Sequence, residues 1–338
     1  GRRFVRLLDE RRDRLAREHG VTWQVHGIAT GRHGCVFDPA GLDTTLACAI
    51  VESGEPLVPS ALSPTAVACA DAHEVIRHGA RFGHDHGVVI ETTTLNVVDG
   101  EPAATHVREA LAAGLHVVSA NKGPVACAYH ELRDLAAREG RRFRFEGAVM
   151  DGIPVFNLVR DTLPAVEVLG FRGVVNSTTN YILCEMERGI PFDEALRDMQ
   201  AQGIAEADAS LDVDGWDAAA KTAALVNVVM GGTLRPADVP RTGIAALTPD
   251  DLRQAIAGGQ RLRLIASARR HDDGSIGAHV GPELVPASDP LAQLAGMANA
   301  LVLVTDLLGE VVITQRDGGL TQTAYALLTD LLSLSRPR

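Results

Sequence analysis

The first half of the chain alternates short apolar segments with amphipathic ones. Buried strands are predicted at GVVIETTT (87–94) and HVVSANK (116–122), because each is an apolar run that ends in polar residues. Helices are predicted at EPAATHVREALAAG (101–114) and HELRDLAAREG (130–140), where apolar residues recur at helical spacing. Short strands that alternate with helices are typical of a parallel, doubly wound sheet. We therefore predict an α/β fold whose first domain covers residues 1–150.

The segment before these strands begins with a helix. Its apolar residues lie at helical spacing: Phe4, Leu7, Leu8 and Leu15. Gly20 is a candidate C-cap, and TWQVHGIAT (22–30) then alternates apolar and polar residues as a strand does. Two further helices are predicted over 42–54 and 63–79, the second with Ser63 as its N-cap and Pro64 in its first turn.

From about residue 150 the pattern changes to mixed helices and hairpins. The run Asp272-Asp273-Gly274 separates two strand-like segments and predicts a β-hairpin. Two more strands are predicted at ALVLVTD (300–306) and EVVIT (310–314), and a terminal helix at LTQTAYALLTDLLSLS (320–335). The sequence thus predicts a second, α+β domain over residues 151–310.

The amino-acid composition and net charge limit the kinds of molecule that this protein can bind. The hydrophobic content of 46% and the charged content of 22% are those of an ordinary globular protein. A net charge of −11 argues against nucleic acid or an anionic membrane surface, and no apolar run has the length of a membrane span. The five cysteines are odd in number and contain no CxxC pair, which predicts reduced thiols in a cytoplasmic protein. We therefore expect a small-molecule substrate and neither a nucleic-acid nor a membrane partner.

The stretch from 173 to 221 contains the candidate chemistry. Asp217 and Lys221 are four residues apart, so they share one face of a helix whose continuation, TAALVNVVMG, is nearly all apolar. On these residues alone a surface ion pair is the more common explanation. A calcium loop fails, because Lys221 stands at its twelfth position, where a bidentate Glu is required. The functional hypothesis is a site for a small polar substrate, in which Glu206 and Asp217 meet its cation and Lys221 moves a proton.

Three segments in this stretch resemble those of one enzyme family. The chain has NSTTNY (176–181), AEADAS (205–210) and DVDGWDAAAK (212–221) in this order. Homoserine dehydrogenases typically have Asn-Gly-Thr-Thr-Asn-Tyr, Ala-Glu-x-Asp-Pro and Asp-Val-x-Gly-x-Asp-Ala-Ala-x-Lys. The sequence resembles this family over nearly its whole length, in the short form without a C-terminal ACT regulatory domain.

The resemblance implies NAD(P)-dependent interconversion of L-homoserine and L-aspartate 4-semialdehyde, a step of threonine and methionine biosynthesis, by a homodimer. It assigns catalytic roles to Lys221, Asp217 and Lys122. It assigns substrate binding to Glu206 and Asp217 for the ammonium group, together with Asn176 and Thr178. It also implies that residues 311–338 pack back onto the first domain and complete it.

A Rossmann-like cofactor domain is implied as well, with NADP or NAD as cofactor. Such a unit opens with a strand and a Gly-rich phosphate loop, which we expect to be absent here, with Gly1 at the position of the last glycine. Cofactor contacts are implied for the following residues: Gly1, Thr93, Asn121, Lys122 and Gly319. At the end of the 22–30 strand, Arg32 can hold the 2′-phosphate of NADP, or it is a solvated loop arginine. Without the resemblance, Lys122 is equally well explained as a capping charge on the following helix.

A monovalent cation, Na+ or K+, is the last implied ligand. The resemblance places it at the Glu146 side chain and at the backbone carbonyls of Val149, Asp151 and Ile153. The family usually has Gly-Gly or Ala-Gly where this chain has Asp151-Gly152, and a helix-capping Asp is an equally good explanation of Asp151.

Two further departures from the family pattern favour a second hypothesis. The segment Gln315-Arg316-Asp317-Gly318-Gly319 replaces a glycine-rich loop that closes over the nicotinamide, and bulky residues hinder close backbone approach. Ser177 replaces a glycine at a position expected to need a positive φ. The alternative function is therefore a non-catalytic or substrate-shifted paralogue that keeps the fold.

Overall fold

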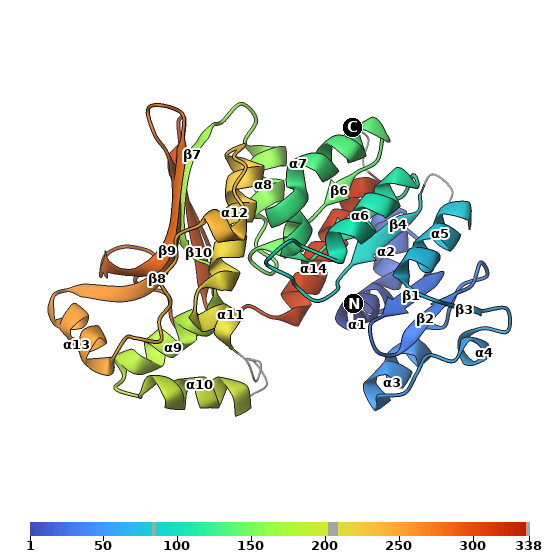
Figure 1. Ribbon diagram of the computed structural model, residues 1–338, viewed down its shortest axis with the longest axis horizontal. Helices are drawn as coiled ribbons and strands as arrows, with labels where there is room; N and C mark the ends of the chain where they lie inside the picture. The colour runs from blue at the N-terminus through green and yellow to red at the C-terminus, as the bar shows by residue number, and fades with distance from the viewer. Residues whose placement is uncertain (83–85, 202–208, 336–338) are drawn as a thin grey trace.

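The computed structural model describes residues 1–82, 86–201 and 209–335, which form two lobes (Figure 1). The N-terminal lobe begins with helices α1 (Arg2–Glu10) and α2 (Arg12–His19). Gly20 ends α2 in the left-handed conformation, with φ 64°, so the predicted C-cap is confirmed.

The first sheet of this lobe differs from the prediction. Strands β1 (Gly27–Thr30), β2 (Gly34–Phe37) and β3 (Val67–Cys69) pair antiparallel, with helices α3 (Thr44–Ser53), α4 (Pro59–Leu62) and α5 (Ala72–Phe82) beside them. The predicted helix over 63–79 is wrong in its first half. Ser63 has extended backbone angles, its side chain bonds to Asp38, and Val67 pairs with Phe37. A free strand edge and a β-branched residue outweigh the local helix signal of Ser-Pro.

The parallel sheet is confirmed for the next three strands. β4 (Val88–Glu91), β5 (His116–Ser119) and β6 (Phe143–Arg144) run parallel in this order. The crossovers contain α6 (Ala103–Ala112) and α7 (Lys122–Arg138), which bury their apolar faces in the main hydrophobic core. Thr93 follows β4 and Lys122 follows β5. Because parallel strands end at the same edge of a sheet, both residues lie at the carboxyl edge of this sheet.

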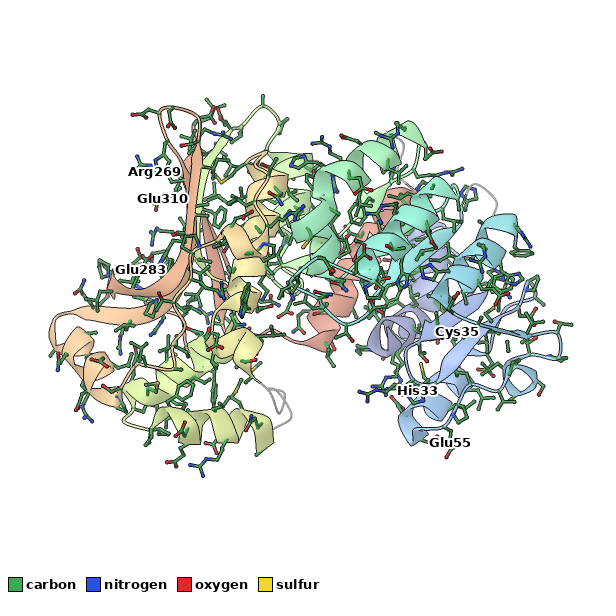
Figure 2. The ribbon with its side chains drawn as sticks, in the orientation of Figure 1. His33, Cys35, Glu55, Arg269, Glu283 and Glu310 are labelled. Atoms are coloured by element: carbon green, nitrogen blue, oxygen red, sulfur yellow. The ribbon has the colours of Figure 1, made fainter. Side chains whose placement is uncertain are left out.

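The second lobe is built on a five-stranded antiparallel sheet of order β11-β10-β7-β8-β9. Its strands are β7 (Val168–Val174), β8 (Gln260–Arg270), β9 (Ile276–Pro286), β10 (Asn299–Thr305) and β11 (Gly309–Gln315). The predicted hairpin at 272–274 joins β8 to β9, with Gly274 at φ 84°. In Figure 2, Arg269, Glu283 and Glu310 lie on the side of this sheet that faces away from the N-terminal lobe.

Among the described residues, six helices and two short turns accompany the sheet, and α9, α12 and α13 pack against its strands. They are α8 (Val155–Thr162), α9 (Ser177–Glu187), α10 (Phe192–Ala201), α11 (Ser210–Val213), α12 (Trp216–Val229) and α13 (Pro249–Ala257), with short 3-10 turns η1 (Glu146–Ala148) and η2 (Pro236–Asp238). Helix α12 is buried along almost its whole length and lies between the sheet and α7 (Figure 1). It therefore joins the two lobes.

The final helix, α14 (Leu320–Leu334), returns to the N-terminal lobe (Figure 1). Its Ala324, Leu327 and Leu328 form a cluster with Phe4, Leu7 and Leu8 of α1. The predicted domain boundary between residues 310 and 311 falls inside β11, so the chain changes lobe at 316–319 instead. Among the described helices, none combines the length and the apolar character that a membrane crossing requires.

Candidate active site

The chemistry predicted for the start of α12 lies where the two lobes meet. Asp217 is in the first turn of α12, and Lys221 is one turn further along. The Nζ of Lys221 lies 2.9 Å from Asp217 Oδ2, and the Nζ of Lys122 lies 3.0 Å from Asp217 Oδ1. One carboxylate thus bridges two amines that are contributed by different helices.

Burial makes this bridge more than a surface ion pair. Asp217 is 8% exposed, and the side chains of Lys122 and Lys221 are 17% and 14% exposed. Burial alone would raise the pKa of Asp217, but Lys122 and Lys221 hold that pKa well below its usual range. Burial alone would lower the pKa of Lys221, but the hydrogen bond and the charge of Asp217 raise it above the usual value. Asp217 is therefore an anion and Lys221 a cation at neutral pH.

Asn176 orients the bridge from a third helix. Its Oδ1 accepts the backbone N–H of Thr179 at 2.8 Å, so Asn176 is the N-cap of α9. Its Nδ2 donates to Asp217 Oδ2 at 2.9 Å and to Asp212 Oδ1 at 2.7 Å. The N-terminal ends of α7, α9 and α12 therefore converge on Asp217, and their positive ends favour a carboxylate there.

The other predicted substrate residues are placed as follows. Thr178 is buried in the first turn of α9, and its side chain bonds to Asp212. The predicted polar turn at 176–180 is the start of this helix, and Ser177 has a negative φ, so the expectation of a positive φ there is wrong. Ser177 Oγ instead accepts a hydrogen bond from Asn299 Nδ2 at 2.8 Å. Glu206 lies outside the described residues.

On the N-terminal lobe, Asn121 fastens the end of β4 to the start of α7. Its Oδ1 caps α7 through Gly123 N at 2.9 Å, and its Nδ2 donates to the Thr93 carbonyl at 3.0 Å. A Cβ atom at Gly1 would lie 3.2 Å from Thr92 Oγ1, so the N-terminus of α1 faces the same strand ends. Backbone N–H groups at a helix start, close to the carboxyl ends of parallel strands, fit a dinucleotide pyrophosphate.

Two predicted cofactor residues lie at the edges of this region. Arg32 is exposed in the turn between β1 and β2, which His33 N closes by donating to Thr30 Oγ1 at 2.8 Å. Figure 2 shows His33 and Glu55 at the lower end of this lobe, where His33 Nδ1 lies 2.9 Å from the Glu55 carbonyl oxygen. Gly319 is the N-cap of α14, on the other side of the site.

The predicted cation residue Glu146 is buried, at 3% exposure, beside α8. Its carboxylate oxygens accept backbone N–H groups from Phe156 at 2.9 Å and Asn157 at 2.6 Å. Burial, reinforced by the nearby Asp330, raises its pKa to about 7. Among the described residues, no side-chain cation pairs with Glu146, so its carboxylate has hydrogen bonds but no counter-ion. That environment fits a bound monovalent cation, with Val149 and Ile153 a few residues further along the same segment.

Several functional features escaped the sequence analysis. Asp212 joins the site through hydrogen bonds from Asn176 and Thr178, and the sequence analysis gave it no role. Glu91 is buried and holds Thr93 N at 2.7 Å, while its other oxygen lies 2.9 Å from His106 Nδ1. One available signal was overlooked: Lys122 and Lys221 are the only lysines in the chain, and every other member of its 32 Lys and Arg residues is arginine. An arginine cannot release a proton at ordinary pH, so the retained lysines mark the site.

Comparisons with known proteins agree with this geometry. The family model described as homoserine dehydrogenase matches residues 154–332, and that described as its NAD binding domain matches residues 1–146. An NAD(+)-dependent homoserine dehydrogenase of Pseudomonas canavaninivorans is 37% identical over 98% of this chain and 92% of its own length. A homoserine dehydrogenase of Methanocaldococcus jannaschii is 41% identical over 74% of this chain and 73% of its own.

A solved structure gives the same result in three dimensions. The crystal structure of a homoserine dehydrogenase from Thiobacillus denitrificans superposes with a TM-score of 0.80 at 30% identity, over 99% of this chain and 70% of that one. Both lobes are therefore shared, and the family models cover the described site on each of them. The chain belongs to the homoserine dehydrogenase family.

Proposed function

We propose that this chain catalyses the NAD(P)-dependent interconversion of L-homoserine and L-aspartate 4-semialdehyde. The observation that carries the proposal is the buried bridge of Lys122, Asp217 and Lys221 at the carboxyl ends of a parallel sheet. The nicotinamide cofactor supplies or accepts the hydride, so the protein must position the substrate and manage one proton. The departures at 151, 177 and 315–319 leave this bridge intact, and nothing in the described residues favours the non-catalytic alternative.

Lys221 is the proton donor in this proposal. Its ammonium has three N–H groups, and two of them are used, by Asp217 Oδ2 at 2.9 Å and by the Val175 carbonyl at 2.6 Å. The third remains for the substrate oxygen at C4. When the semialdehyde is reduced, the carbonyl oxygen gains negative charge and takes this proton. When homoserine is oxidised, the hydroxyl must pass its proton to a lysine that has first lost its own.

Lys122 and Asp217 position the proton donor. Asp217 holds the two amine groups in place, with the Nζ of Lys221 at 2.9 Å and the Nζ of Lys122 at 3.0 Å, so Lys122 supports the charge that develops on the substrate oxygen. The substrate ammonium is assigned to the acidic side of the site, at Asp212, Asp217 and Glu206, with Asn176 and Thr178 fixing the two aspartates. Burial and the nearby Asp217 raise the pKa of Asp212. A substrate ammonium ion beside it would lower this pKa again by supplying a positive charge.

The cofactor is assigned to the strand ends of the N-terminal lobe. We assign the pyrophosphate to Gly1, whose Cβ position is 3.2 Å from Thr92 Oγ1, and further cofactor contacts to Thr93, Asn121 and Lys122. We also assign Gly319 and the segment before it to the nicotinamide end, and Arg32 to the 2′-phosphate of NADP. A monovalent cation is assigned to Glu146 with the carbonyls of Val149, Asp151 and Ile153.

A homodimer in the cytoplasm completes the proposal. The five-stranded sheet leaves large apolar side chains exposed: Leu284, Leu308 and Val312 are 54%, 54% and 44% exposed. Leu284 lies on the edge strand β9 and Val312 on the opposite edge strand β11, and we assign these exposed apolar side chains to contacts with a second copy. All five cysteines are free, as a reducing compartment requires. Light scattering of the purified protein measures the subunit number, and a monomer at micromolar concentration would refute the dimer.

The test of function is oxidation of NADH and NADPH with L-aspartate 4-semialdehyde. We expect turnover in the unaltered chain and a loss of at least roughly 10³-fold in kcat for Lys221→Ala, because general acid catalysis contributes 10²–10⁴-fold. Lys221→Arg should also be inactive, since it keeps the charge but cannot release the proton. Circular dichroism and Tm show whether these variants stay folded. Turnover by folded Lys221→Ala at the unaltered rate would remove Lys221 from the mechanism.

A further inference from the structure

The segment between η1 and α8 meets the connection between β11 and α14 at Asp151. This residue has φ 50°, a left-handed conformation that Asp and Asn tolerate better than most other side chains. The hydroxyl of Thr323, in the first turn of α14, lies 3.1 Å from Asp151 Oδ1 and 3.1 Å from the Gly319 carbonyl. The Thr323 proton is thus shared between the Asp151 side chain and the backbone at the start of α14.

Two glycines make close contacts around Asp151. A Cβ atom at Gly318 would lie 2.5 Å from Asp151 Oδ2, and one at Gly152 would lie 2.8 Å from the Gln322 carbonyl. Gly318 does not have a positive φ, so its lack of a side chain is required by the contact with Asp151 and not by its backbone. The Asp151 carboxylate therefore occupies the space that a side chain at 318 would fill.

The contact between Asp151 and Gly318 lies within electrostatic range of Lys221. The charge of Asp151 acts on Lys221 and stabilises its ammonium form. On the other side, the Cβ position of Gly318 is 3.6 Å from Ser177 Oγ, which Asn299 holds. Asp151 and Ser177 thus flank Gly318 at the N-terminus of α9, two residues beyond Val175, whose carbonyl accepts a hydrogen bond from Lys221 Nζ at 2.6 Å.

We propose that Asp151 is a positioning residue of the active site: its carboxylate, bonded to Thr323 and packed against Gly318, seats the 315–319 segment beside Lys221. The inference rests on the proposed function, since that function makes the neighbourhood of Lys221 the substrate site. It concerns the side chain of Asp151, whereas the proposed cation contact concerns its backbone carbonyl. The Gln-Arg-Asp-Gly-Gly segment is then held beside the site by the Asp151 side chain. A glycine-rich loop would instead approach the site with its backbone.

The first test compares Asp151→Ala with Asp151→Asn. Alanine removes the acceptor for Thr323, and we expect the KM for homoserine to rise roughly tenfold with a smaller change in kcat, as loss of substrate positioning does. Asparagine tolerates the left-handed backbone and keeps the acceptor oxygen, so it should restore most of the affinity. Thr323→Val should resemble Asp151→Ala. Thr321→Val, on the same helix turn but bonded to Arg3, is the matched control and should behave as the unaltered chain.

The second test measures how firmly the 315–319 segment is held, and it does not depend on enzyme turnover. Arg316 is exposed, so trypsin cleaves the Arg316–Asp317 bond at a rate that reports how firmly the segment is seated. We expect this cleavage, followed by mass spectrometry, to be at least roughly fivefold faster in Asp151→Ala and Thr323→Val than in Thr321→Val. Because the chain has only two lysines, isotope labelling of lysine gives two side-chain NMR signals, and Asp151→Ala should shift that of Lys221 more than that of Lys122.

The third test measures coupling between the two sides of the contact. Gly318→Ala places a methyl group against Asp151 Oδ2 and should itself raise the KM and the cleavage rate. In the double variant with Asp151→Ala the clash is gone, so the effects should be clearly less than additive. All assays are repeated in Na+ and in K+ to separate the segment from the cation.

Additive effects, an unchanged cleavage rate in Asp151→Ala, or a Lys221 signal that does not move would each overturn the inference. The cleavage and NMR measurements stand even if the chain does not turn over homoserine. In that case the proposed function fails, but these two measurements still show whether Asp151 holds the 315–319 segment in place.

Discussion

The molecule contains two buried carboxylates, Asp217 and Glu146, whose surroundings shift the pKa in opposite directions. Asp217 is bridged by Lys122 and Lys221, and its pKa lies well below the usual range. Glu146 is about as well buried but receives only backbone N–H groups and lies near Asp330, and its pKa is raised to about 7. Burial is common to both sites, so the presence of a full positive charge decides the direction.

The difference assigns different tasks to the two sites. At Asp217 the countercharges are part of the protein, so the site is charged and ordered before any ligand arrives. At Glu146 the countercharge is missing from the described side chains, and the site is left to be completed by an ion or a proton. The first arrangement suits catalysis, and the second suits a structural ligand between the lobes.

The largest effect should come from removing the carboxylate that both lysines share. Asp217→Asn leaves Lys122 and Lys221 without the carboxylate that pairs with both of them, so we expect kcat/KM to fall by roughly 10³-fold and the free energy of unfolding by about 3 kcal/mol. Steady-state kinetics and urea denaturation measure the two losses. Asp214→Asn, in the same segment but exposed, is the control. A kcat/KM within twofold of the unaltered chain would show that the bridge is only structural.

The next effect is the pH dependence of the two reaction directions. The pKa of Lys221 is raised above its ordinary 10.5 by Asp217, so the lysine is a cation across neutral pH. Reduction of the semialdehyde needs that cation and should be level from about pH 6 to 9, whereas oxidation of homoserine needs the neutral amine and should rise with pH throughout. The NMR signal of Lys221 in lysine-labelled protein reports the titration directly. A midpoint below pH 9 would contradict this account.

Glu146 should affect stability rather than turnover. Its pKa is raised from 4.5 to about 7 on folding, so the folded chain binds the proton more tightly and stability falls as pH rises between these values. The loss amounts to a few kcal/mol at most. Glu146→Gln should abolish this pH slope, although its single acceptor oxygen lowers the overall stability.

The same carboxylate tests the cation. At pH 8 we expect Na+ or K+ to raise the Tm of the unaltered chain relative to tetramethylammonium at equal ionic strength, and to leave the Tm of Glu146→Gln unchanged. Exposed Glu139→Gln should respond as the unaltered chain does. An equal response of all three proteins would mean that no cation binds at Glu146.

The smallest effect is expected at Asp212. Asp212→Asn keeps an oxygen that accepts the hydrogen bond from Asn176, but it removes one negative charge from the proposed ammonium site. The KM for homoserine should therefore rise about threefold to tenfold with kcat nearly unchanged. Initial-rate kinetics at saturating cofactor measure this change. A fall in kcat with an unaltered KM would move Asp212 from substrate binding to proton management.

Local patterns in the sequence determined much of this protein. Alternating apolar and helical segments predicted the parallel strands β4 and β5, and the Asp-Asp-Gly turn predicted the β8–β9 hairpin. The four-residue spacing of Asp217 and Lys221 predicted their contact, because helical geometry alone brings such residues together. The short strand β3 was missed, because a strand of three residues depends on the partner edge that β2 offers.

Only the tertiary structure decided how the site is assembled. Lys122 and Asp217 are 95 positions apart, and they meet because α7 and α12 pack together and present their N-terminal ends at one point. The same convergence gives Asn176 two carboxylates to bridge and places the side chain of Asp151 beside Gly318. These contacts, and the direction of each pKa shift, depend on which charges share a buried volume, and chain spacing contains no information about that.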